Sequence, residues 1–256
     1  MLLVISTPAL AAEKDWENSL VTDRPDSAES SLVVGKYRLQ METSISHSHN
    51  QDAGVRTQAV FFPTLFRFGV FDWLEARMES NWLQIQKATG SATQTGFNDI
   101  ALGVKGHAWD QDGFRPSSGA LLHISTPTGA NAYTADVFIP TFKLLNDWDL
   151  PRDFSLGTNV GFDVPERDAA NQKFARFLYA IALGIPIANT EERLRLFTEM
   201  AGAVPVDSID NPEYKADAGF TFLLTPDMQL DLFANFGLNE STTDVITGVG
   251  FSWRAL

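Results

Sequence analysis

Serine and histidine are the residue types in this chain that could support nucleophilic catalysis. Two of its four histidines, His47 and His49, alternate with serines, and His123 is two residues from Ser125. A serine nucleophile needs a histidine within hydrogen-bond reach and an acid or amide that orients the histidine. The sequence has no Gly-x-Ser-x-Gly elbow, and no third ligand would complete a metal site with His47 and His49. An acyl hydrolase is therefore a minor alternative, and we expect no enzyme activity.

Charged side chains are the second group of residues that could do chemistry, and they recur at every other position of short segments. In residues 74–82 the even positions are mostly apolar, while Glu75, Arg77 and Glu79 occupy odd positions. Side chains on a β-strand point to opposite faces with a period of two. This alternation predicts strands with one face toward lipid or a core and the other toward water.

Such segments run the length of the chain, each closed by Gly, Asp, Asn or Pro, and they predict an all-β, antiparallel transmembrane β-barrel of about 12 strands. Longer polar connections alternate with shorter ones, so we expect the longer set to face outside and the shorter set the periplasm. The longer connections are 47–55, 84–96, 127–137, 164–173, 205–213 and 238–246. The expected strands are 36–46, 56–67, 74–83, 97–109, 117–126, 138–145, 154–163, 174–185, 194–204, 214–223, 229–237 and 247–254.

The positions opposite to the apolar face should line the interior of the barrel. Charges of both signs then face one another there, either bracing a narrow barrel or lining a substrate pathway. Phenylalanines share these positions, which fits a path for an apolar or aromatic molecule as well as it fits plain packing. The expected lumen-lining residues are Arg38, Glu42, Phe61, Arg67, Glu75, Arg77, Glu79, Lys105, Arg176, Phe197, Glu199 and Phe233.

Composition limits the partners of the chain. It has 256 residues, enough for one barrel domain, no cysteine and a formal net charge of -13. The lack of cysteine excludes disulfides, thiol catalysis and cysteine-type zinc or iron–sulfur sites. The acidity argues against nucleic acid, whose phosphate backbone requires clusters of Lys and Arg. No cofactor is expected.

The N-terminal residues have the pattern of an export signal. A short apolar run at 2–5 precedes the string PALAA at 8–12 and the charged string EKD, which resembles a cleavage site after Ala11 or Ala12. A basic n-region is missing, so the signal is truncated at its start or the run is a buried N-terminal strand. We assign 1–12 to a signal peptide, 13–35 to a periplasmic or plug segment and 36–256 to the barrel. An exported barrel predicts a Gram-negative outer membrane.

Several strings carry a resemblance to a known family. TDRPDSAES, at 22–30, is followed by the alternating string GKYRLQMETSIS. Three later strings are PTLFRFGVFDWLEARMES, TGFNDIALGVK and ISTPTG. In these motifs the chain resembles the outer-membrane proteins of the MetA-pathway phenol-degradation family, and the resemblance extends over nearly the whole mature chain.

The resemblance implies an outer-membrane passive channel or transporter for small, hydrophobic or aromatic compounds. It also implies a segment tucked at or inside the barrel mouth, acting as a gating plug or only as an anchor, formed by Asp23, Arg24, Pro25 and Asp26. Arginine binds carboxylates through two parallel hydrogen bonds. We therefore expect Arg24 to pair with an inward carboxylate such as Glu42, Glu75 or Glu79.

The expected partners are small hydrophobic or aromatic solutes, outer-membrane lipid and lipopolysaccharide, and the barrel-assembly machinery. The chain ends in FSWRAL, where the assembly signal of such barrels has a terminal Phe, and this departure puts efficient insertion in question. Two alternatives compete with the channel. A structural or surface-interaction barrel would pass no solute, and a soluble periplasmic barrel or sandwich would turn its aromatic face into an internal core.

Overall fold

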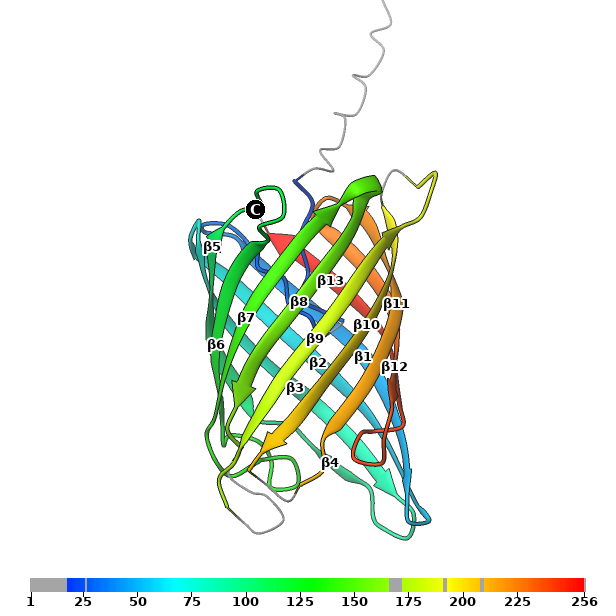
Figure 1. Cartoon of the computed structure of the whole chain (residues 1–256). Coiled ribbons are helices and arrows are strands. Elements are labelled where there is room, and N and C mark those ends of the chain that lie inside the picture. Colours follow the sequence, from blue (N-terminus) through cyan, green and yellow to red (C-terminus); the bar gives the residue numbers. More distant parts are fainter. Residues whose placement is uncertain (1–17, 26, 166–171, 191–192, 208–209, 256) are drawn as a thin grey trace, which may run out of the picture.

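The chain folds as a closed, tilted antiparallel barrel in the computed structural model (Figure 1). The structure describes residues 18–25, 27–165, 172–190, 193–207 and 210–255, and in these residues thirteen strands form one sheet that closes where β2 pairs with β3. The prediction of a twelve-stranded transmembrane barrel is confirmed, and the thirteenth strand, β4, is a three-residue addition that pairs with β3 alone. The strands are β1 (Leu39–Asp52), β2 (Val55–Phe71), β3 (Leu74–Ala88), β4 (Gln94–Gly96), β5 (Ile100–Trp109), β6 (Ser117–Thr126), β7 (Ile139–Leu150), β8 (Phe154–Asp163), β9 (Ala175–Pro186), β10 (Leu194–Val206), β11 (Glu213–Thr225), β12 (Met228–Gly237) and β13 (Val245–Ala255).

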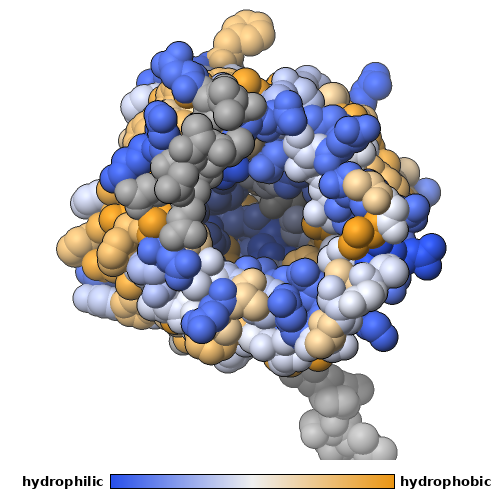
Figure 2. Space-filling model, turned by 90° about the horizontal axis from the view of Figure 1, so that it is seen from below, coloured by the Kyte–Doolittle hydropathy of each residue, from blue (hydrophilic) through white to orange (hydrophobic). Residues whose placement is uncertain are grey.

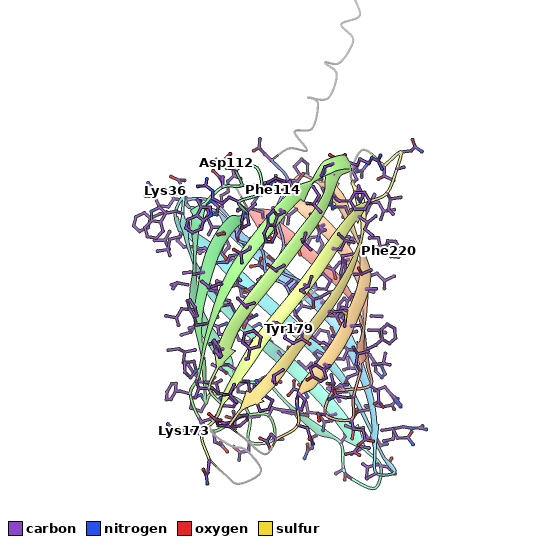
Figure 3. The ribbon with its side chains drawn as sticks, viewed as in Figure 1. Lys36, Asp112, Phe114, Lys173, Tyr179 and Phe220 are labelled. Carbon is purple, nitrogen blue, oxygen red and sulfur yellow. The ribbon has the colours of Figure 1, made fainter. Side chains whose placement is uncertain are left out.

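The two faces of the wall have the polarity of a membrane barrel. Large apolar side chains such as Leu102, Ile181 and Met200 point outward and are more than half exposed, and Phe220 projects from the outer surface in Figure 3. Charged residues such as Glu75 and Lys105 point inward and are fully buried. The soluble-barrel alternative is therefore wrong, because it requires the aromatic face to be a buried core.

The first hairpin is longer than the sequence pattern predicted. Residues 47–55 were expected to form a loop, but β1 and β2 stay paired out to Asp52 and Val55. Their connection is the two-residue turn Ala53–Gly54, whose φ angles of 47° and 84° are those of a type I′ hairpin turn. In this extension both faces are polar, so alternation could not reveal it. Residues 84–88, which were also expected to belong to a loop, continue β3.

The start of the barrel is also displaced from its expected position. Residues 36–38, assigned to the first strand, lie in a turn where Tyr37 has a φ of 63°. Arg38 is half-buried at this turn, and its carbonyl accepts a hydrogen bond from Gly69 N at 3.0 Å. A third difference concerns β7, which extends to Leu150 through residues that were expected to form a connection.

The barrel has two distinct ends. Lys36, Asp112 and Phe114 mark one end, where the short connections and both described chain ends lie, and Lys173 marks the other (Figure 3). We call these the turn end and the loop end. Seen from the loop end, the barrel is hollowed, with hydrophilic residues inside and many hydrophobic ones around its outer side (Figure 2). No helix among the described residues is long and apolar enough to cross a membrane.

Candidate functional site

The described residues of 18–35, which we call the N-terminal segment, lie inside the barrel. The segment begins at the turn end, where Leu20 N donates to Pro226 O at 2.7 Å and Arg254 Nη2 donates to Asn18 O at 2.6 Å. Hydrogen bonds or ion pairs join it to eleven of the twelve spanning strands, and on β9 Ala180 and Ala182 form a buried cluster with Ala28. Its described residues therefore contact the wall around the whole circumference.

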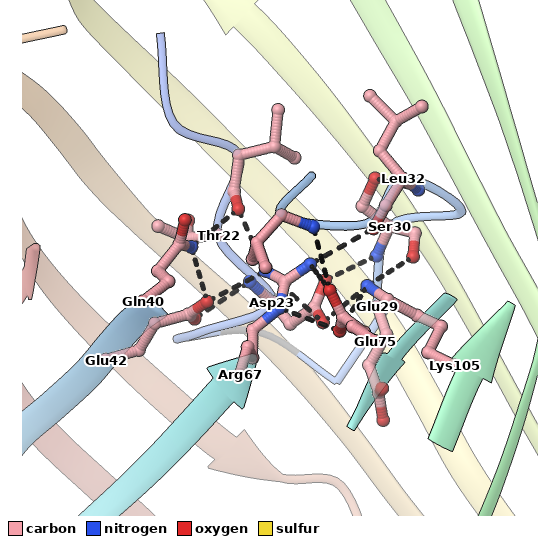
Figure 4. A network of polar contacts seen from close by, with 12 residues as sticks. Thr22, Asp23, Glu29, Ser30, Leu32, Gln40, Glu42, Arg67, Glu75 and Lys105 are labelled. Carbon is pink, nitrogen blue, oxygen red and sulfur yellow. Dashed lines mark hydrogen bonds and ion pairs between the residues drawn. The ribbon is translucent and has the colours of Figure 1, made fainter. Parts of the chain in front are cut away.

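Asp23 is the centre of the network that holds the segment (Figure 4). Its Oδ2 atom lies 2.7 Å from Arg77 Nη1, 2.7 Å from Lys105 Nζ and 3.5 Å from Arg67 Nη1. Asp23 and the three cations are each at most 4% exposed. The cations come from neighbouring strands and would repel one another, so the carboxylate of the segment compensates charge that the wall presents.

Glu29 makes the second anionic contact of the segment. Its Oε1 accepts a hydrogen bond from Lys143 Nζ at 2.8 Å, and its Oε2 lies 2.8 Å from Arg77 Nη1. The main chain of Glu29 exchanges two hydrogen bonds with the amide of Asn159, at 2.6 and 2.9 Å. Both the side chain and the backbone of this residue are thus fixed by the wall.

Carboxylates of the wall bind the backbone of the segment in return. Glu42 accepts from the amides of Asp23 and Arg24 at 2.9 Å, Glu75 accepts from Val34 at 2.9 Å, and Glu199 accepts from Ser27 at 2.9 Å and Ala28 at 2.6 Å. Hydrogen bonds to an ionised acceptor are stronger than neutral ones. The wall therefore recognises the path of the main chain as well as its side chains.

Arg24 contacts the first strand through its side chain and its backbone. Its guanidinium donates to Ser44 Oγ at 2.7 Å, and its backbone N–H donates to Glu42 at 2.9 Å. Arg67 binds two of the inward carboxylates named for Arg24, with Nη1 2.9 Å from Glu42 and Nε 2.9 Å from Glu75. Because Arg67 belongs to the wall, the sequence pattern of the segment could not identify it. Pro25 follows in the same part of the segment, and Asp26 lies outside the described residues.

Side chains that face one another across neighbouring strands form rows that order the lumen. On β10 the inward positions from the loop end are Ala203, Ala201, Glu199 and Phe197, which cover about 20 Å at about 3.3 Å per residue. Ala203 and Ala201 line a cavity, Glu199 binds the N-terminal segment, and Phe197 belongs to an aromatic row. One strand therefore passes the cavity, the segment and the aromatic row in sequence.

The cavity, which we call the apolar chamber, has a volume of about 190 Å³. Two rows build its wall, one containing Ala180, Ala201 and Lys215 and the next containing Leu178 and Ala203. The second row ends at Lys143 on β7. Ser27 of the N-terminal segment and Thr242 of a loop-end connection also line the chamber. The chamber therefore lies on the loop-end side of the segment.

The three phenylalanines expected in the lumen belong to a single row across β10, β11, β12, β13, β1 and β2. Its members are Phe197, Gly219, Phe233, Gly248, Ser46 and Phe61. A Cβ at Gly219 would lie 2.6 Å from the ring of Phe197, and one at Gly248 would lie 2.5 Å from the ring of Phe233. Two rings thus lie against glycine backbone, where any other side chain would displace them.

A second cavity, which we call the polar chamber, lies against the opposite arc and has a volume of about 340 Å³. Its lining includes Arg24, Glu79, Asp99, His123 and Ser125. His123 Nδ1 lies 3.4 Å from Glu79 Oε1, and no hydrogen bond joins His123 to Ser125 within the described residues. The histidine thus has a carboxylate partner but no serine positioned as a nucleophile.

One loop over the polar chamber is held by Asp99. Its Oδ1 accepts from Gly129 N and its Oδ2 from Ala135 N, both at 2.8 Å. Desolvation by burial favours the neutral carboxyl, but the amide donors outweigh it and hold the pKa of Asp99 below its usual value.

The remaining predicted residue, Arg176, lies near the loop end. It binds Asp163 at 2.5 Å and Glu213 at 3.1 Å. Four further residues take part in the contacts between the N-terminal segment and the wall, although the sequence did not identify them as site residues. They are Glu29, Ser31, Asp147 and Lys215. The polar string around Glu29, which lacks strand alternation, was the signal that could have identified it. For Asp147 the signal was hidden, because its strand was expected to end at 145.

Comparisons with known proteins agree with the architecture. The family described as Putative MetA-pathway of phenol degradation matches residues 22–255. An outer membrane channel from Pseudomonas putida F1 is similar with a TM-score of 0.66 and 10% sequence identity, covering 92% of this chain and 100% of that chain. The translocator domain of the autotransporter NalP from Neisseria meningitidis is similar with a TM-score of 0.53 and 12% identity, covering 85% and 88%. The NanC porin has a TM-score of 0.53 and 12% identity, covering 82% and 98%.

Low identities of this kind establish the fold, and that fold is shared by channels and autotransporter domains. No curated protein matches the chain. The barrel and its apolar outer face confirm the expected location in the outer membrane. The family match extends from the first residues of the N-terminal segment to the last strand, and the chain belongs to the family described as Putative MetA-pathway of phenol degradation.

Proposed function

We propose that the protein is a passive channel of the outer membrane for small hydrophobic or aromatic compounds, and that its N-terminal segment closes the lumen. The observation that carries the proposal is that this segment crosses the lumen on the turn-end side of the apolar chamber. On β10, Glu199, which binds Ser27 and Ala28, stands between Ala201 of the chamber and Phe197. A solute that crosses the barrel here must displace the segment from Glu199.

The proposed path begins at the loop end, which we assign to the outside, and ends in the periplasm. A solute enters the apolar chamber and the part of the lumen lined by Phe61 and Phe233, passes the segment and then contacts Phe197. Phe197 and Phe233 are each less than 10% exposed while the segment is in place. No energy source or cofactor is needed, because the solute moves down its own gradient. The names of the family and of the Pseudomonas putida channel agree with this proposal.

A liposome experiment tests the proposal directly. The full chain is refolded into liposomes, and uptake of a neutral toluate ester is compared with uptake of a sugar of similar size. We expect faster entry of the ester alone. Entry of both solutes would indicate a general pore, and entry of neither would contradict transport. Empty liposomes give the background, since the ester also crosses lipid by itself.

A structural or surface-interaction barrel is the second candidate. It is favoured by the number of strands that bind the N-terminal segment, because a lumen closed so completely suits a protein that passes nothing. In that case a variant that releases the segment would create a leak without any selectivity for the ester. A hydrolase lacks a comparable observation, since no hydrogen bond joins His123 to Ser125 within the described residues.

A further inference from the structure

The apolar chamber has the size of a single ring with one substituent. A dry apolar cavity of about 150 Å³ accommodates benzene. At about 190 Å³, the chamber leaves room for a small group beyond the ring. Leu178, Ala180, Ala201 and Ala203, which face one another on β9 and β10, contribute apolar side chains to its lining.

The charged groups around the chamber are not equally compensated. Lys143 is 2.8 Å from Glu29, and Glu213 is 3.1 Å from Arg176, so each of these has a close partner of opposite sign. Lys215 binds the hydroxyl of Ser27, and the Oδ2 atom of Asp217 lies 3.8 Å from its Nζ atom. An ammonium group has three donors. Lys215 is therefore the lining cation with the weakest anionic contact in the described residues.

Position relates this cation to the apolar surface. Lys215 is paired with Ala201, and Ala201 with Ala180, so the ammonium group stands next to two alanines of the same row. A ring lying on the alanines would direct one edge substituent toward Lys215. Its side chain is 30% exposed, so the ammonium group is accessible to a molecule inside the chamber.

We infer that the apolar chamber binds a monocyclic aromatic carboxylate, with its ring on Leu178 and the alanines and its carboxylate on Lys215. This inference rests on the proposed function and narrows its solute class. Charge-assisted hydrogen bonds are stronger than neutral ones, which distinguishes an acid from its hydrocarbon analogue. A sugar is disfavoured because its hydroxyl groups would face alanine and leucine without partners.

The test compares two probes of the same shape, 4-fluorobenzoate and 4-fluorotoluene, by fluorine NMR binding to the full chain in detergent micelles. The variant is Lys215→Met, and the matched control is Lys173→Met, which removes the same charge from an exposed position at the loop end (Figure 3). We expect Lys215→Met to weaken 4-fluorobenzoate about tenfold, the effect of one charge-assisted hydrogen bond, and to leave 4-fluorotoluene unchanged. Lys173→Met should change neither probe.

Other outcomes overturn the inference. Equal weakening by both variants would mean that net charge attracts the acid, and no weakening by Lys215→Met would place the acid elsewhere. Should 4-fluorobenzoate fail to bind while the toluate ester still enters liposomes, the inference fails and the proposed function stands. Heat-modifiable gel migration reports whether each variant is folded. If Lys215→Met does not fold, Ala203→Leu replaces it and must abolish binding of 4-fluorobenzoate.

Discussion

Two arcs of the same wall face the lumen with different chemistry. On β2, β3 and β5 the inward residues Arg67, Arg77 and Lys105 lie at ion-pair distances from Asp23, and on β1 Glu42 pairs with Arg67. On β8, β9 and β10 many inward positions are alanine, glycine or leucine, and the lumen stays hollow beside them. The first arc fastens the N-terminal segment and borders the polar chamber, and the second borders the apolar chamber.

This difference shows what the alternation of residues does and does not specify. A period of two decides which face a side chain points to, and it is the same in both arcs. Whether the interior is filled or open depends on the size and charge of the inward residues. The pattern of polarity alone would describe both arcs as facing the lumen.

The charged arc should respond most strongly to the loss of Asp23. Asp23→Asn keeps the shape of the side chain but leaves Arg67, Arg77 and Lys105 without its charge, and breaking a buried pair costs roughly 3–5 kcal/mol. We expect the N-terminal segment to leave the lumen, with a large rise in single-channel conductance in planar bilayers. Asp112→Asn, at a side chain that is 84% exposed, should leave conductance unchanged. Equal conductance of both variants would contradict closure by the segment.

The small-residue arc should respond in the opposite way to a larger side chain. Ala203→Leu fills the apolar chamber without touching the ion pairs, at a packing cost of about 1–3 kcal/mol. We expect uptake of the toluate ester to fall while conductance to ions stays at its basal level. Undiminished ester uptake would place the path outside the chamber.

Removal of Arg24 should have a smaller effect on the charged arc. Arg24→Ala deletes the hydrogen bond to Ser44 Oγ but keeps Asp23 in place, and one such bond contributes about 1–3 kcal/mol. A modest increase in leak conductance, well below that of Asp23→Asn, is the expected result. A leak as large as that of Asp23→Asn would show that Arg24 rather than Asp23 dominates the fastening.

The weakest effect should concern the loop over the polar chamber. Because the pKa of Asp99 is lowered in the fold, its contribution is complete above the ordinary pKa of an aspartate and is lost as pH falls through the lowered value. The amide proton shift of Gly129 should therefore change in acid, and Asp99→Asn should remove that change. A change in the Gly129 amide proton shift only at neutral or higher pH would contradict this direction.

Much of the fold could be predicted because lipid imposes a strict period on each strand. The strands 117–126 and 154–163 were expected with the bounds that β6 and β8 have in the structure. The long first hairpin was missed because outside the membrane the ladder hydrogen bonds hold it, and both of its faces are polar. Backbone hydrogen bonding between the two strands, rather than hydropathy, decides such extensions.

The candidate site was less predictable, for a physical reason. Alternation placed Glu42, Arg67 and Glu75 on the inner face, but their mutual contacts depend on the register between strands. The same information decides that Phe61, Phe197 and Phe233 share one row. Without register, Arg24 was an equally reasonable partner for the inward carboxylates as Arg67.

The position of the N-terminal segment has a consequence for how the barrel is built. Arg254, at the end of the last strand, donates to the carbonyl of Asn18, and Glu42 on the first strand binds the same segment. Residues separated by most of the chain therefore meet on one segment where the seam between β1 and β13 closes. Contacts of such long range form slowly, since loop-closure entropy must be overcome first. A segment proposed to close the lumen would thus also hold together the two ends of the sheet that form the cylinder.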